Sequence, residues 1–318
     1  MKYNAYEASV RRSLWAWADR HHRDELDSGG RQKRPPVLDK RFVAANILVP
    51  EDKARARKVI AAIPGPQRHR WFGSLKSSQA LTQSVFGAIR AFDRLDLLKD
   101  VSADCGMPAF FPDLKGVRLD FEQEPGCLGE PRPTSIDVLL HGLAGKVAIE
   151  CKFTEREFGM CSRPNLKPGD KTYPQQHCDG SYRVQHGRRE RCALSEIGVQ
   201  YWRYLPGLFD WPADRDHLLC PLRNVYQLGR NALAATVTPK GTVDTSGRHV
   251  LVVYDARNPE FLPNGKAGRQ WEAAIEACRV SGLLRRVSWQ RLLTAAAGAR
   301  ELSYLVEALE EKYGLKPA

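Results

Sequence analysis

Apolar residues recur every three or four positions along residues 77–92, and this spacing is typical of one face of an α-helix. Ser77 and Ser78 stand near the start of this pattern, and either is a plausible N-cap of the helix. The apolar face consists of Leu81, Val85, Ile89 and Phe92. The pattern predicts a second, polar face that carries Gln79, Gln83 and Arg90.

Three strand-like segments follow this helix. Polar and apolar residues alternate in residues 116–124, whereas residues 134–140 and 146–153 are richer in apolar residues. The last two segments are joined by the loop HGLAG, and two apolar runs around a short glycine-containing loop predict a β-hairpin. Residues 249–255 are apolar on both faces, as expected of a central strand.

The remaining segments define the organisation of the chain. Residues 1–70 are polar and basic and predict an N-terminal extension with short helices, so that residues 71–318 form the main domain. Within it, residues 154–221 are rich in glycine, proline, cysteine and charge and predict an insertion, with a helix beginning near its end. Residues 286–318 predict two amphipathic helices. The order of helix, three strands, helix, strand and C-terminal helices predicts an α/β fold of mixed layers.

The chain carries an excess of positive charge. Its 49 lysines and arginines exceed its 37 acidic residues, which gives a net charge of +12. This excess favours a polyanionic partner such as nucleic acid, whose phosphates basic side chains neutralise. Basic residues cluster in residues 31–41, 53–58 and 183–191, although any one cluster taken alone also fits a solvated surface without a partner.

The hydrophobic pattern offers no membrane-spanning or secretory segment. No apolar run is long enough to cross a bilayer, and the N-terminal sequence MKYNAYEASVRR lacks the apolar stretch of a signal peptide. We therefore expect a cytoplasmic protein with no membrane partner. In that compartment the eight cysteines are expected to be reduced thiols and not disulfides.

The predicted hairpin carries the residues with the clearest chemistry. Glu150 and Lys152 share one face of their strand, because side chains alternate along a strand. If the turn is centred between residues 143 and 144, Asp137 lies directly opposite Glu150. The Cβ atoms of such opposed residues are about 4.5–5.5 Å apart. Two carboxylates at that separation repel each other unless a cation lies between them.

These residues predict a magnesium site. One or two carboxylates, completed by water and a substrate phosphate, are the usual ligands of Mg²⁺, and Mn²⁺ is an alternative ion. Such an ion polarises a phosphoryl oxygen and activates water, while Lys152 can orient that water or stabilise charge on the phosphate. An ordinary surface hairpin with a Glu–Lys pair is the alternative. We favour the metal site because Asp137 is in register with Glu150.

At these residues the chain resembles the PD-(D/E)xK superfamily of restriction-endonuclease-like nucleases. The matching motifs are Ile136-Asp137 for the first acid and Glu150-Cys151-Lys152 for the E-x-K, and the order of elements is similar to that of the superfamily core. Several segments between residues 74 and 261 also resemble a bacterial family of restriction endonucleases. They are SLKSSQALTQSVFG, LGEPRPTSIDVLL, IECKFTEREFGMC, VYQLGRN and YDARNPEF.

The resemblance implies a restriction-endonuclease-like core, which is a mixed central sheet flanked by helices, here with a cysteine-rich insertion. It implies Mg²⁺-dependent hydrolysis of phosphodiester bonds, with Asp137 and Glu150 as metal ligands and Lys152 as the catalytic lysine. Many members place a glutamate on the first helix, where this chain has glutamines. Glu130, in the loop before Asp137, is a candidate substitute, and a turn or ion-pair role is its alternative.

Gln227 is a further candidate catalytic residue on the helix after the insertion. It resembles the glutamine that follows the E-x-K strand in RecB-like members, although Asn231 stands where a tyrosine is expected. Gln227, Arg230 and Asn231 share one helix face. An ordinary solvated polar face is the alternative interpretation of this group.

Four cysteines fall in or at the edge of the insertion. We expect so turn-rich a segment to lack an apolar core of its own, so four thiolates on a tetrahedral Zn²⁺ would supply folding free energy. The spacings match no C-x₂-C finger, and His177 is an alternative ligand. An iron–sulfur cluster, as in certain RecB-like nucleases, and unrelated free thiols are the other interpretations. The four residues are Cys161, Cys178, Cys192 and Cys220.

The densest basic run lies between two of these cysteines and predicts a clamp on the nucleic-acid backbone. Its candidate residues are Arg183, Arg188, Arg189 and Arg191. The function expected from the whole pattern is a restriction, defence or repair endonuclease that cuts double-stranded DNA, and the resemblance suggests a homodimer. The alternatives are a nucleic-acid-binding protein with an inactive nuclease scaffold and a nuclease directed at RNA.

Overall fold

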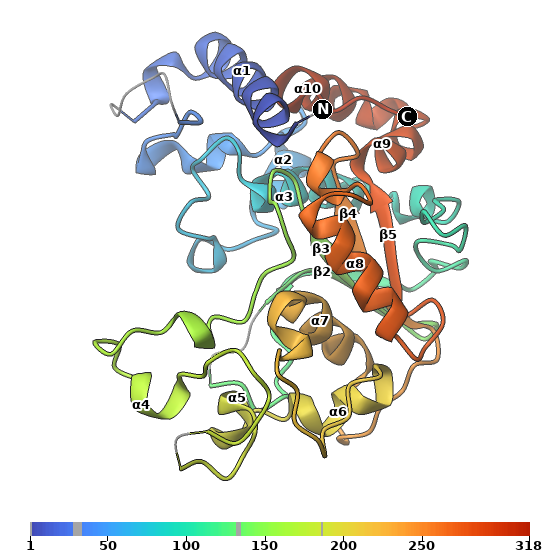
Figure 1. The fold of residues 1–318 in the computed structure, drawn as a ribbon. Coiled ribbons are helices and arrows are strands. Elements are labelled where there is room, and N and C mark those ends of the chain that lie inside the picture. The colour runs from blue at the N-terminus through green and yellow to red at the C-terminus, as the bar shows by residue number, and fades with distance from the viewer. Residues whose placement is uncertain (1, 28–33, 132–134, 186) are drawn as a thin grey trace.

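The computed structural model describes residues 2–27, 34–131, 135–185 and 187–318. The undescribed residues include part of the basic cluster 31–41, the first residue of the predicted strand 134–140 and one residue of the basic run 183–191. Five strands form one mixed sheet in the order β1-β2-β3-β4-β5 (Figure 1). They are β1 (Arg118–Gln123), β2 (Ile136–Gly142), β3 (Gly145–Cys151), β4 (Arg248–Tyr254) and β5 (Leu284–Ser288). The predicted α/β class and mixed sheet are confirmed.

The connections explain the direction of each strand. A two-residue turn joins β2 to β3, with Gly142 paired to Gly145, so these strands are antiparallel. Gly145 has a φ of 138°, a conformation that glycine adopts without strain. Strands β3, β4 and β5 run parallel to one another, because long crossover segments that contain helices separate them along the chain.

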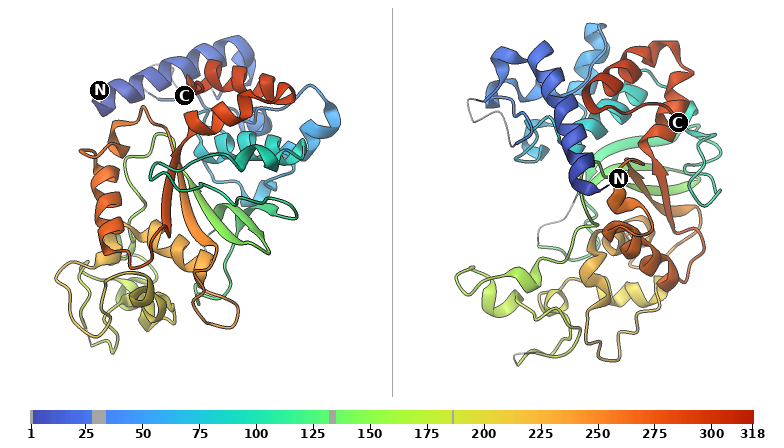
Figure 2. Two further views of the ribbon diagram at one scale, coloured as in Figure 1. Left: turned by 90° about the vertical axis from the view of Figure 1, so that its right-hand side faces the viewer. Right: turned by 45° about the horizontal axis from the view of Figure 1, so that its top comes forward.

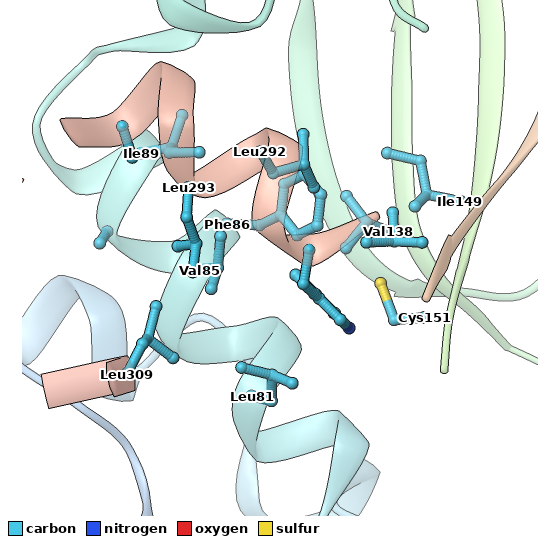
Figure 3. Packing of buried hydrophobic residues seen from close by; sticks show 14 of the residues in the cluster. Leu81, Val85, Phe86, Ile89, Val138, Ile149, Cys151, Leu292, Leu293 and Leu309 are labelled. Carbon is cyan, nitrogen blue, oxygen red and sulfur yellow. The ribbon is translucent and has the colours of Figure 1, made fainter. Parts of the chain in front are cut away.

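Helices cover both faces of the sheet, as Figure 2 shows. One core joins α3, α9 and α10 to one face, and a second core joins α7 and α8 to the other. In the first core, Leu81, Val85 and Phe86 of α3 belong to the same cluster as Val138 and Ile149 of the hairpin (Figure 3). The helices are α1 (Tyr3–His21), α2 (Lys53–Ile60), α3 (Ser78–Ala91), α4 (Tyr173–Gln176), α5 (Ala193–Glu196), α6 (Tyr201–Leu208), α7 (Tyr226–Thr236), α8 (Lys266–Ala277), α9 (Trp289–Ala297) and α10 (Ser303–Tyr313).

Helix α3 begins where the sequence predicted but is buried on nearly all sides. The Ser77 hydroxyl accepts the Ala80 N–H at 3.2 Å, which confirms the predicted N-cap. The expected polar face is wrong for Gln83, which is fully buried. Its Nε2 donates to the carbonyl oxygens of Val59 and Ile60 at 2.8 and 2.9 Å. Helix α2 thus covers the side of α3 that the sequence pattern predicted to be exposed to solvent.

The N-terminal residues pack into the same core as the sheet. Helix α1 lies against α10, and Tyr6 and Leu14 belong to the core cluster that also contains Phe153. The Tyr6 hydroxyl donates to a carboxylate oxygen of Asp255 at 2.9 Å. The proposed division of the chain at residue 70 stays a prediction. In the described part of the chain, no helix has the length and apolar character required to cross a membrane.

The segment of residues 154–221 has two parts with different packing. Its C-terminal part contributes Tyr201, Trp202 and Leu205 to the second core, so the expectation that this segment lacks apolar packing is wrong there. Between residues 160 and 191, by contrast, Tyr182 is the single buried hydrophobic side chain among the described residues. Helix α8 and strand β5 were not predicted, whereas α9 and α10 match the two expected C-terminal helices.

Strand β4 makes the stability of the fold depend on pH. His249 is buried, and its Nε2 lies 2.9 Å from the Ala109 carbonyl oxygen. Burial, with the charge of Arg285, lowers the pKa of His249 to about 4, against about 6.5 in an unfolded chain. As the pH falls, His249 binds a proton in the unfolded state at a higher pH than in the folded state. Acid therefore stabilises the unfolded state relative to the folded state. Lowering the pH from 7.5 to 4.5 should therefore remove about 2.5 kcal/mol through this residue.

Urea unfolding at the two pH values tests this prediction. The variant His249→Gln should lose about 2 kcal/mol less than the wild type over the same interval. His69→Gln, at an exposed histidine, is the control and should follow the wild-type profile. Equal losses in wild type and His249→Gln would contradict the prediction.

Candidate active site

A cavity of about 1280 Å³ opens beside the ends of β2 and β3. Asp137, Glu150, Lys152 and Gln227 all line it, so the structure brings these four predicted residues together. The opposite wall comes from the N-terminal part of the chain and includes an exposed tryptophan, Trp71. The cavity is therefore built from segments far apart in the sequence.

The hairpin has the predicted register. Val138 pairs with Ile149, and the same ladder places Asp137 beside Glu150 at the next position. Lys152 follows β3 directly and is held in an extended path by two hydrogen bonds. Its backbone N–H donates to the Val253 carbonyl oxygen at 2.7 Å, and its own carbonyl oxygen accepts from the indole of Trp289 at 2.9 Å. The position of Lys152 is thus fixed by the sheet and by α9.

Glu150 and Lys152 form a buried ion pair. Lys152 Nζ lies 2.8 Å from Glu150 Oε1 and donates to Gln227 Oε1 at 2.6 Å. The other carboxylate oxygen of Glu150 accepts from Asn231 Nδ2 at 2.7 Å. Both side chains are buried, with 5% of the Glu150 side chain and 7% of the Lys152 side chain exposed. The amides of α7 therefore fix the orientation of both charged groups.

The charges in the cavity are strongly coupled. Burial opposes the ionisation of Glu150, but Lys152 and Arg230 outweigh it and lower the pKa of Glu150. Burial likewise opposes the charge on Lys152, yet its interaction with Glu150 raises the pKa of Lys152. Burial and then repulsion from Glu150 and Glu122 raise the pKa of Asp137 well above its usual range. The surroundings therefore favour the charged forms of Glu150 and Lys152 and disfavour the charge on Asp137.

Sequence reasoning missed a third acid in this cavity, Glu122 on β1. Phe121 pairs with Val138 and Gln123 with Ile136, which places Glu122 at the level of Asp137. Glu122 has a φ of 48°, is buried, and accepts a hydrogen bond from Gln79 Nε2 at 2.5 Å. Burial, together with repulsion from Glu150, raises the pKa of Glu122.

The alternation of polar and apolar residues along β1 is the one sequence signal that indicates where Glu122 points. Alternation along β1 places it on the opposite face from Leu119 and Phe121, which enter the first core. The register between β1 and β2 has no short turn to fix it, because residues 124–135 separate the strands. The sequence thus indicates the face of Glu122 but not its neighbours.

The polar face of α7 turns toward the cavity. Arg230 and Asn231 are buried, so the interpretation of this face as solvated is wrong. Gln227 Oε1 accepts the Gly159 N–H at 2.7 Å as well as the Lys152 ammonium. A Cβ on Gly159 would lie 2.7 Å from the Gln227 side chain, so the glycine permits this close approach.

Other predicted residues lie outside this cavity. Glu130 accepts a hydrogen bond from the Tyr201 hydroxyl and is not part of the cavity lining. Its proposed role as a ligand of a metal at Asp137 and Glu150 therefore has no geometric support, because its hydrogen-bond partner Tyr201 belongs to the second core.

The described residues of the basic run 183–191 are also not among those that line the cavity. Arg183 and Arg191 each form an ion pair with an aspartate, at 2.8 and 2.7 Å. Arg188 donates to a backbone carbonyl oxygen, and 92% of the Arg189 side-chain surface is exposed. Part of the charge in this run is therefore neutralised within the chain, and a clamp on nucleic acid stays a prediction.

The four cysteines of the insertion line one small cavity of about 20 Å³. The predicted grouping of Cys161, Cys178, Cys192 and Cys220 is thus present. As placed, no three His, Cys, Asp or Glu side chains among the described residues already stand as a set of metal ligands. Cys151 is buried in the first core, as the strand pattern predicted.

Comparison with known proteins adds a family match. Residues 11–314 match the family model described as "Restriction Endonuclease associating with ARP". The match includes all five strands and every residue of the cavity named above. Neither the curated proteins nor the solved structures contain a significant match to the chain.

Proposed function

This chain belongs to the family of restriction endonucleases associating with ARP, and we propose that it hydrolyses phosphodiester bonds of DNA with Mg²⁺ bound at Asp137 and Glu150. The observation that carries the proposal is the pairing of these two carboxyl groups across the hairpin, beside the Lys152 ammonium. The family membership supports a nuclease. The metal, the substrate and the residue roles are the proposal.

The oxygen atoms around the cavity fit Mg²⁺. Mg²⁺ is commonly held by one or two carboxylates together with water and phosphate, and Asp137 and Glu150 provide two. Glu122, at the same level of the sheet, is a third candidate. The repulsion among these acids raises the pKa of Asp137 and of Glu122, and a bound cation would remove that repulsion. When bound, the ion supplies Lewis-acid activation of the phosphate and of water.

Lys152 has the position required of a catalytic cation. Its ammonium is fixed by Glu150 and by Gln227, both within hydrogen-bond distance. An ammonium has three donor hydrogens, so one remains for the attacking water or for a phosphate oxygen. A fixed donor stabilises charge that develops in the transition state without first having to reorganise. Gln227 is then a positioning residue that acts through Lys152.

Arg230 provides a second buried cation in the cavity. It is 4% exposed, lines the cavity and has an Nε without a hydrogen-bond partner in the described part of the chain. Arg34, Lys76 and Arg156 line the same cavity. Side chains of this charge attract a phosphate backbone, which supports a nucleic-acid substrate. We propose double-stranded DNA, and a homodimer would supply the two active sites that a double-strand cut requires.

Incubation with supercoiled plasmid tests the proposal. The wild type should nick or linearise the DNA with Mg²⁺ or Mn²⁺ and should be inactive in EDTA. Asp137→Asn should lower the cleavage rate by about a hundredfold or more, because it removes a charged metal ligand. Asp120→Asn is the matched control, since Asp120 lies on the same sheet, pairs with His141 at 2.6 Å and is outside the cavity.

Three results would contradict parts of the proposal. Cleavage that persists in Asp137→Asn would refute the site, and cleavage in EDTA would refute the metal requirement. Cleavage of RNA with DNA left intact would reassign the substrate. A folded wild type that binds DNA but cuts neither nucleic acid would instead support the inactive scaffold.

A further inference from the structure

The part of the insertion between residues 160 and 191 has very little apolar packing. Tyr182 is its single buried hydrophobic side chain among the described residues. Ordering a segment of this length costs conformational entropy that burial of one side chain does not offset. Nevertheless this segment packs against the loop before α7, where Cys161 N–H donates to the Arg223 carbonyl oxygen at 2.9 Å. Some other interaction must hold it in place.

Four thiols converge on one small cavity in this segment. Cys161 lies in the loop after β3, Cys178 follows α4, Cys192 precedes α5, and Cys220 precedes the turn into α7. The cavity measures about 20 Å³, which is the space of one water-sized sphere. A space of this size suits a single ion better than a cluster of several iron and sulfide atoms. The size of the cavity therefore favours one metal ion.

The local backbone at each cysteine is suited to a thiolate. Near each sulfur lies the backbone N–H of the residue two positions later in the chain, which favours the charged form of the thiol. Those N–H groups belong to Arg163, Gly180, Leu194 and Leu222. Hydrogen bonds to sulfur stabilise its charged form and orient metal-ligating thiolates. Cys278 has a similar local environment but does not line this cavity. The four cysteines therefore differ from Cys278 in that their side chains share one cavity.

Two of the cysteine loops are also joined directly. Cys220 N–H donates to the Gly180 carbonyl oxygen at 2.9 Å. Gly180 has a φ of 87°, and a Cβ there would lie 2.7 Å from the guanidinium of Arg223. The positive φ favours glycine at this position, because other residues adopt it only with strain. The arrangement thus depends on backbone contacts as well as on the thiols.

We propose that Cys161, Cys178, Cys192 and Cys220 together bind one structural Zn²⁺ as four thiolates. As placed, the thiols border the cavity without closing on one centre, so binding requires their side chains to turn inward to Zn–S distances of about 2.3 Å. Binding releases the thiol protons to solvent and leaves zinc without a site for substrate. Arg163 and Arg188 lie close enough to Cys161 and Cys178 for their charges to offset the negative centre.

Metal analysis of the full-length protein tests this proposal. Protein purified without chelator should contain about one zinc per chain. Cys178→Ser and Cys220→Ser should each remove most of that zinc. Cys278→Ser is the matched control for the loss of a thiol. Asp137→Asn tests whether the zinc is bound at the proposed nuclease centre. Both variants should retain about one zinc per chain. Loss of DNA cleavage in Asp137→Asn with zinc retained would show that the two sites are distinct.

A second measurement on the wild type remains informative even if the serine variants fail to fold. Alkylation mapped by mass spectrometry should leave the four cysteines unmodified until a strong zinc chelator is added. A folded wild type without zinc, an iron-containing protein that absorbs visible light, or a disulfide among these cysteines would overturn the proposal. Zinc that persists in both Cys178→Ser and Cys220→Ser would overturn it as well.

Discussion

Replacement of Lys152 by methionine should lower the rate of DNA cleavage by about a thousandfold, because one fixed charged donor at a transition state contributes about that much. Lys152 is the buried cation that contacts both Glu150 and Gln227, so water cannot take its place. Methionine retains much of its volume and removes only the charge and the donors. Single-turnover cleavage of plasmid at saturating Mg²⁺ measures the effect on chemistry apart from binding.

Lys146→Met is the matched control for this variant. Lys146 lies on the same strand, and its Nζ donates to the Ala234 carbonyl oxygen at 3.3 Å, away from the cavity. Its cleavage rate should stay within about threefold of the wild type. Because Lys152→Met also leaves Glu150 with fewer partners, its thermal melting should be recorded beside its activity. A folded Lys152→Met protein that cuts within tenfold of the wild-type rate would contradict the assignment.

Trp289→Ala should lower the free energy of unfolding by about 3–5 kcal/mol, the usual cost of removing a large buried aromatic side chain. Trp289 is fully buried at the start of α9, and its ring centre lies 6.2 Å from that of Phe86. Its indole N–H also donates to the Lys152 carbonyl oxygen. Urea unfolding measures the loss.

Trp71→Ala is the control for this second prediction. Trp71 is 59% exposed, so its replacement should change the free energy of unfolding by about 0.5 kcal/mol or less. Similar losses in the two variants would show that the packing around Trp289 contributes far less than its burial indicates.

The elements that the sequence predicted best are those whose contacts are local. The hairpin of β2 and β3 has the expected register because a two-residue turn leaves little freedom in how the strands pair. Strand β5 was missed because Arg285 and Arg286 interrupt its apolar pattern. The partners of these arginines lie far away in sequence, as the contact of Arg286 with Asp104 at 3.1 Å shows. No local pattern reveals such a partner.

The residues of the candidate site divide in the same way, into those whose placement depends on local contacts and those whose placement depends on contacts far apart in the sequence. Asp137, Glu150 and Lys152 were found from strand alternation and one short turn, which are local properties. Glu122 was missed because its place beside Asp137 depends on strand pairing across a long loop. Likewise, the burial of Arg230 depends on how α7 lies on the sheet, and periodicity along the helix does not determine that.

The two walls of the cavity come from different parts of the chain. The acids and Lys152 lie on the sheet, where each position is fixed by strand pairing or by α7. The facing wall, which includes Trp15, Arg34 and Trp71, comes from the first eighty residues. Exposed positions of that wall, such as Trp71, can be substituted while strand pairing keeps Asp137 and Glu150 in place. For the proposed nuclease, variation at such positions is therefore a route to altered target preference.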